Sequence, residues 1–192
     1  MCRSPEAAEA HRQAAIASIE AVFSLKEIYI REPDVDGLRA RYRRLWDELV
    51  WTYTEAPGKF WGQRYWSRAA LKQYQQQLGS GKPHKGLCHD HVIEREGLFR
   101  AFLNSESPAH SQALLERAVS CVLTVKEHDD VRKTSGHCWD RYRGKGIKVL
   151  DLGPEANRQA FGCKRRKGKV GLIGQWLEAA PALPLVCHCA GQ

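Results

Sequence analysis

The chain has 192 residues, of which 43% are hydrophobic and 27% charged, a composition typical of a globular protein and not of a disordered one. No stretch approaches the roughly 20 consecutive apolar residues of a membrane helix, and the first residues lack the apolar core of a signal peptide. We therefore expect a cytoplasmic protein that does not enter a membrane. The formal net charge of +8 favours a polyanionic partner, most simply nucleic acid.

The first part of the chain predicts three amphipathic helices. The first begins at Pro5 behind a serine cap and carries one apolar stripe as far as Ile28. The second has its apolar stripe over residues 38–50 and a row of arginines on its other side. The third covers residues 66–78, with Ser67 as its cap.

Aromatic residues are concentrated around these helices. Trp46, Trp51, Trp61 and Trp66 lie among arginines and lysines, a mixture that also occurs on surfaces that stack nucleobases. We expect most of them to form the core of a helical region, because large aromatic side chains are usually buried.

After a glycine-rich break at residues 79–83 the pattern changes to short strands that alternate with helices. The expected strands cover residues 86–93, 121–125 and 147–150. The expected helices cover residues 94–103, 107–120, 126–133, 136–143 and 154–161. The sequence thus predicts a mainly helical α+β fold in three parts, namely a helical N-terminal region (1–79), a small strand-containing module with a helical insertion (80–152) and a basic C-terminal segment (153–192).

Histidines and acidic residues gather on the first and second of these strands and just beyond them. Asp90-His91-Val92-Ile93 ends the first strand, and Cys121-Val122-Leu123-Thr124 leads into a helix that carries Lys126-Glu127-His128. Over residues 86–133 this arrangement resembles the His-Asn-His (HNH) endonucleases, whose module is the ββα-metal fold.

The resemblance implies metal-dependent hydrolysis of phosphodiester bonds in DNA. By position, His91 corresponds to the general base, and Asp90 and His128 correspond to ligands of one divalent ion. An Asp oxygen together with a His nitrogen suits Mg, Mn or Zn. Because neighbouring residues of a regular strand point to opposite faces, Asp90 and His91 share one site only where the strand is irregular.

The chain departs from the family pattern in ways that keep a second hypothesis open. No asparagine stands at residues 119–121, where the family has one that orients the base, and Glu94 stands where a proline is common. The paired CxxC motifs that hold a structural zinc in many members are absent. The alternative is a non-catalytic basic module that binds nucleic acid or protein, with a structural or zinc-bound cluster of histidines and cysteines. The residues for such a zinc site are Cys88, His89, Cys121, His128, His137 and Cys138.

Two groups of basic residues are candidates for contacts with nucleic-acid phosphates. Arg141, Arg143 and Lys145 lie in the strand-containing module, downstream of the two motifs, and the consecutive Lys164, Arg165, Arg166 and Lys167 lie in the C-terminal segment. A solvated surface is the ordinary alternative for a run of charges.

Overall fold

The computed structural model describes residues 4–32, 37–60, 62–77, 84–134 and 138–153. The basic run at residues 164–167 and the helix expected over 154–161 lie outside these ranges. None of the helices described is long and apolar enough to cross a membrane.

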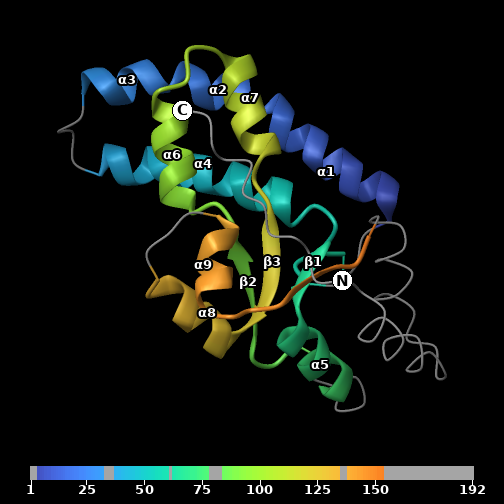
Figure 1. Cartoon of the computed structure of the whole chain (residues 1–192). Coiled ribbons are helices and arrows are strands. Elements are labelled where there is room, and N and C mark those ends of the chain that lie inside the picture. The colour runs from blue at the N-terminus through green and yellow to red at the C-terminus, as the bar shows by residue number, and fades with distance from the viewer. Residues whose placement is uncertain (1–3, 33–36, 61, 78–83, 135–137, 154–192) are drawn as a thin grey trace.

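The described residues form an α+β fold in which helices surround a four-stranded mixed sheet (Figure 1). The strands are β1 (Tyr65–Ser67), β2 (Leu87–His91), β3 (Ser120–Thr124) and β4 (Val149–Asp151). The helices before β2 are α1 (Pro5–Ala17), α2 (Ile19–Ser24), α3 (Lys26–Arg31), α4 (Leu38–Thr54) and α5 (Arg68–Gln77). The later helices are α6 (Arg95–Leu103), α7 (Pro108–Glu116), α8 (Val125–Arg132) and α9 (Trp139–Gly144).

The sheet has the order β2-β3-β1-β4, with β2 at one edge. The β2 and β3 strands form an antiparallel pair in which Asp90 lies opposite Cys121 and His91 lies opposite Ser120. The α8 helix follows β3 directly, and its capping box joins the Thr124 and Glu127 side chains to each other's backbone. This antiparallel pair followed by a helix is the expected order of elements, although the likeness to a ββα-metal module rests on the motifs alone.

The sequence did not predict the β1 strand. β1 lies inside the region expected to be helical, pairs parallel with β3 and antiparallel with β4, and so joins that region to the strand-containing module. The long first helix is also divided, at Ser18 and Leu25, into α1, α2 and α3. Ser67 does cap α5, since its Oγ accepts a hydrogen bond from the Ala70 N–H at 2.9 Å.

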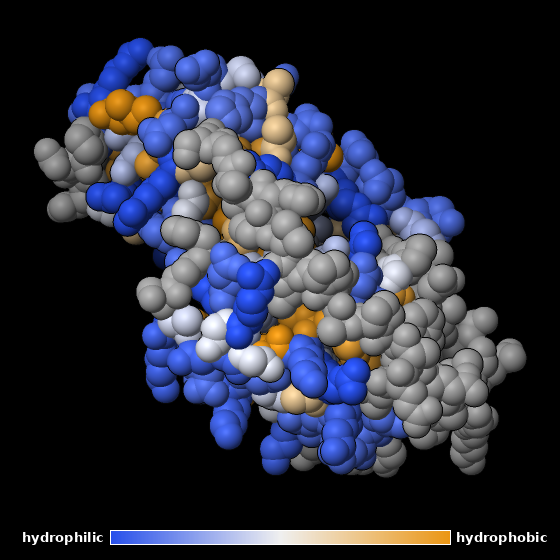
Figure 2. All heavy atoms as spheres, viewed as in Figure 1, coloured by the Kyte–Doolittle hydropathy of each residue, from blue (hydrophilic) through white to orange (hydrophobic). Residues whose placement is uncertain are grey.

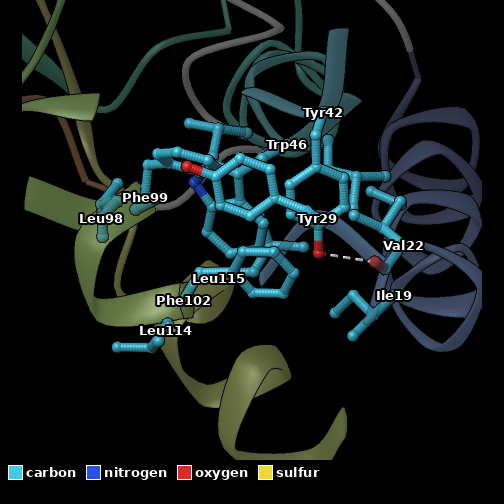
Figure 3. Close-up of a cluster of buried hydrophobic side chains, with 14 residues drawn as sticks. Ile19, Val22, Tyr29, Tyr42, Trp46, Leu98, Phe99, Phe102, Leu114 and Leu115 are labelled. Atoms are coloured by element: carbon cyan, nitrogen blue, oxygen red, sulfur yellow. Dashed lines mark hydrogen bonds between the residues drawn. The ribbon is translucent and has the colours of Figure 1, made fainter. Parts of the chain in front are cut away.

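The helices α1 to α4, α6 and α7 pack into a core of their own above the sheet in Figure 1. Trp46 is fully buried, and its ring stacks on Phe102 with centroids 4.2 Å apart. Tyr42 stacks on Tyr29, and its hydroxyl donates a hydrogen bond of 2.8 Å to the Val22 carbonyl oxygen (Figure 3). The expectation that these aromatics form the core of a helical region is confirmed for Trp46, whereas Trp66 is buried on β1 in the core between the sheet and α5.

Each face of the sheet is covered by different helices. Tyr142 of α9 and Val131 of α8 pack with Cys121 on one face. Leu71 of α5 packs with Val122 on the other face. Because side chains alternate along a strand, neighbouring residues of β2 contact different helices, and this determines the geometry of the candidate site.

Candidate functional site

A pocket of about 680 Å³ runs along the edge strand β2 and is bounded by α4, α6, α8 and α9. All five residues of β2 contribute to its lining, as do Trp51 of α4 and His128 of α8. Five basic residues also line it, namely Arg43, Lys59, Arg95, Arg132 and Arg141. The carboxylates of Asp90, Glu94 and Glu96 line it too, and Arg43, Arg95 and Arg141 are paired with carboxylates. Lys59 and Arg132 are therefore the cations that remain for an anionic ligand among the described residues.

Asp90 and His128, the two predicted metal ligands, meet in this pocket. The Asp90 Oδ1 and the His128 Nε2 are 3.5 Å apart. Two donor atoms about 2.0–2.1 Å from one ion and at right angles to each other are about 3 Å apart, so the two side chains would have to approach by about 0.5 Å to share an ion. The pair comes together because α8 begins at the end of β3 and packs back over β2.

The other oxygen of Asp90 is held by α9. The Tyr142 hydroxyl donates a hydrogen bond to Oδ2, and the Arg141 Nη2 lies 3.7 Å from the same oxygen. Burial raises the pKa of Tyr142 well above its ordinary value, so this hydroxyl remains a proton donor. Asp90 is thus oriented with Oδ1 toward His128. The sequence did not single out Tyr142 for this contact, because a tyrosine within a short helix carries no motif.

His91 does not join that pair. Its Nε2 lies 3.1 Å from the Thr54 Oγ1 of α4, and its ring meets Trp51 edge-on with centroids 4.5 Å apart. Burial, with a smaller contribution from the charge of Arg95, lowers the pKa of His91 to about 3. The ring therefore lies on the opposite face of β2 from Asp90, as a regular strand requires.

His89 lies on the same face as His91. Its ring packs against Trp51 with centroids 5.1 Å apart, and its Nδ1 is 3.6 Å from a carboxylate oxygen of Glu55. Burial, reinforced by His91 and Lys59, holds the pKa of His89 well below its ordinary value. Both histidines are therefore neutral at pH 7.

The basic residues predicted to contact nucleic acid differ in their positions. The Arg141 side chain is only 3% exposed and donates hydrogen bonds to the backbone oxygens of His91 and Val92 at 2.9 and 3.0 Å. It forms part of the pocket wall and fixes the end of β2. Arg143 is exposed and pairs with Asp140 at 3.4 Å, and Lys145 is exposed. Lys164, Arg165, Arg166 and Lys167 lie outside the described residues.

The described residues do not form the zinc site that the sequence offered as an alternative. No three His, Cys, Asp or Glu side chains come together there in an arrangement that could hold a metal ion. Burial raises the pKa of both Cys88 and Cys121, which opposes the thiolate form that zinc binds. His137 lies outside the described residues.

The number of protein ligands limits which metal ions fit this site. Asp90 and His128 supply one carboxylate oxygen and one imidazole nitrogen, fewer protein ligands than a zinc site usually has. Magnesium is commonly bound by one or two carboxylates, with water and substrate phosphate completing its shell. The pair therefore suits Mg²⁺ or Mn²⁺ in a site that remains open to a phosphate.

Comparison of the chain with protein-family models, with curated proteins and with solved structures found no match.

Proposed function

We propose that the protein hydrolyses phosphodiester bonds in DNA with the help of a divalent ion held by Asp90 and His128. The single observation that carries this proposal is the 3.5 Å approach of these two side chains in a pocket lined by five basic residues. The resemblance of the two motifs to those of the HNH endonucleases supports the same reaction.

In the proposed reaction the bound ion, Mg²⁺ or Mn²⁺, would stabilise negative charge on the phosphate and on the leaving oxygen. Tyr142 holds the Asp90 carboxylate in position, and the pocket cations that are not already paired would bind the substrate phosphates. Of these cations, Lys59 and Arg132 form no ion pair with any other described residue.

The role of His91 as general base stays a prediction. To accept a proton from water near Asp90 and His128, its imidazole must leave Thr54 and turn around the edge of β2. A base is most effective when its pKa is near the working pH, and the buried position holds the pKa of His91 at about 3. Exposure on substrate binding would raise that pKa toward its ordinary value.

The second candidate function is a non-catalytic module that binds a polyanion in the same pocket. The position of His91 favours it, because the predicted base contacts Thr54 and Trp51 and does not face Asp90 and His128. In this case Asp90, which is buried, and His128, which is half-buried, stabilise the fold as a pair.

A plasmid-nicking assay in Mg²⁺ or Mn²⁺ separates the two functions. We expect the native chain to nick the plasmid, and His128→Ala and Asp90→Asn to lose at least 100-fold in rate. His110→Ala, which changes an exposed histidine of α7, is the matched control and should keep full activity. Binding without cleavage in both metals would leave the non-catalytic module as the function.

A further inference from the structure

A second hollow, of about 340 Å³, lies along the flank of α8 that faces α5. Its walls carry Arg68 and Lys72 from α5, and Lys145 and Lys148 from the segment between α9 and β4. We call this hollow the basic groove. It is separate from the pocket that holds Asp90 and His128, and the two have no lining residue in common.

The positive charge of the basic groove is available to a ligand. All four basic side chains are exposed, and none forms an ion pair with another residue in the described ranges. Two acidic residues also line the groove, Glu127 and Asp130. The Glu127 Oε2 accepts hydrogen bonds from the Ser67 hydroxyl at 2.6 Å and from the Thr124 N–H at 2.9 Å, which hold this carboxylate against the start of α8. Four basic and two acidic side chains leave the lining with an excess of positive charge.

The backbone holds the two walls of the groove together. The Arg68 N–H donates a hydrogen bond of 2.8 Å to the Lys148 carbonyl oxygen, so the start of α5 is fixed to the segment before β4. Arg68 and Lys72 are four residues apart on α5, which places their side chains on one face of that helix. The four cations therefore lie on two backbone segments that are held together, one on each side of the groove.

The groove and the pocket lie on opposite flanks of α8. Glu127 and Asp130 line the groove, whereas His128 and Arg132 line the pocket. A helix with its side chains is about 10–12 Å wide, and successive phosphates of one DNA strand advance about 3.4 Å along the duplex axis. One strand that crosses α8 would thus reach both sites within about three or four nucleotides. In the lower part of Figure 2, where α5 and α8 lie, hydrophilic side chains surround a smaller hydrophobic patch.

We propose that the basic groove binds backbone phosphates of duplex DNA and holds the strand that enters the pocket. This inference rests on the proposed function for the choice of DNA as the partner. Exposed lysines and arginines on two walls suit a polyelectrolyte, which releases counterions when its phosphates are neutralised. Lys145, which the sequence predicted to contact phosphate, is one of the residues that line this groove.

The test is the salt dependence of binding to a fluorescent DNA duplex in EDTA, where no cleavage occurs. The groove variant replaces Arg68, Lys72, Lys145 and Lys148 by Gln. The slope of log K against log salt is negative, and each lost phosphate contact reduces its magnitude by about 0.9. If all four cations contact phosphate, we expect the magnitude to fall by about 3.6, with a loss of at least about 10-fold in affinity at about 0.1 M salt. The control variant replaces four exposed arginines outside the groove by Gln, namely Arg39, Arg41, Arg44 and Arg117. It therefore removes the same charge as the groove variant.

We expect the control variant to change the slope by less than about 1. Equal decreases in the two variants would show a general charge effect and overturn the proposal, as would an unchanged slope in the groove variant or no DNA binding by the native chain. Displacement of the duplex by polyglutamate at equal charge would identify an acidic peptide as the partner and also overturn it.

The same variants separate this inference from the proposed function. If the native chain nicks DNA while the groove variant keeps the native slope, the groove assignment fails alone. If the groove variant loses the slope while the native chain never nicks DNA, the nuclease assignment fails alone.

Discussion

The Asp90 carboxylate on β2 and the His128 imidazole on α8 face each other at 3.5 Å, although helices α6 and α7 lie between them in the chain. If these two side chains share an ion, each should contribute to its binding. We expect Asp90→Asn and His128→Ala each to weaken Mn²⁺ binding by at least 10-fold, measured by electron paramagnetic resonance of free Mn²⁺. His110→Ala should bind Mn²⁺ as the native chain does, and equal binding by all three variants would exclude the site.

Tyr142 and Arg141 link α9 to β2, and we expect Arg141→Met to destabilise the protein strongly. The substitution leaves Asp90 without its cation and two backbone oxygens of β2 without donors, and breaking a buried pair of this kind typically costs about 3–5 kcal/mol. Arg143→Met, at an exposed neighbouring position, should change the free energy of unfolding by less than about 0.5 kcal/mol. Urea denaturation measures both, and similar losses in the two variants would contradict a structural role for Arg141.

The buried histidines should make stability depend on pH. The pKa of His91 falls from 6.5 in the unfolded chain to about 3 in the folded one, so between these values the unfolded state binds more protons. The stabilisation is complete above pH 6.5 and is lost as the pH falls toward 3, with a slope of up to about 1.4 kcal/mol per pH unit for each such histidine. His89, whose pKa is also lowered, acts in the same direction.

Urea denaturation in EDTA at pH 7, 6 and 5 measures this dependence. His91→Leu and His89→Leu should each make the free energy of unfolding less sensitive to pH, whereas His110→Leu should not. A slope that persists in both buried-site variants would assign the pH dependence to other groups.

Alanine substitutions at two glycines should change the stability of the protein in opposite directions. At Gly62 a new Cβ would overlap the carbonyl group of Pro57, so Gly62→Ala should destabilise by about 1–3 kcal/mol. At Gly97, inside α6, a Cβ meets no atom within 4 Å, and Gly97→Ala should stabilise by about 0.5–1 kcal/mol. Thermal unfolding followed by circular dichroism distinguishes these outcomes, and a rise in Tm for Gly62→Ala would contradict the predicted overlap.

The parts of the fold that depend on local signals could be predicted from the sequence. The Ser67 cap, the strands around His89 and Val122, and the helix that carries His128 follow from capping residues and hydrophobic periodicity. The β1 strand could not be predicted, because three residues show no period and this strand forms only through its pairing with β3 and β4.

The candidate site was predictable only where a motif exists. The motifs identified Asp90 and His128. They could not identify the partners of His91, because Thr54 and Trp51 lie at ordinary helical positions of α4. Arg141 was predicted to contact phosphate because it is basic and lies downstream of the two motifs in the same module. Its burial depends on how α9 packs against β2, which composition does not reveal.

The place of β1 in the sheet has a consequence for how the chain folds. Tyr65 and Trp66 pair with Cys121 and Val122, a parallel contact between segments distant in sequence that requires a large loop to close. A fragment that begins after α5 would contain β2, β3 and β4 but would lack the one strand that joins β3 to β4. The helical region and the strand-containing module should therefore fold in a single cooperative transition, and neither should be obtainable as an independent piece.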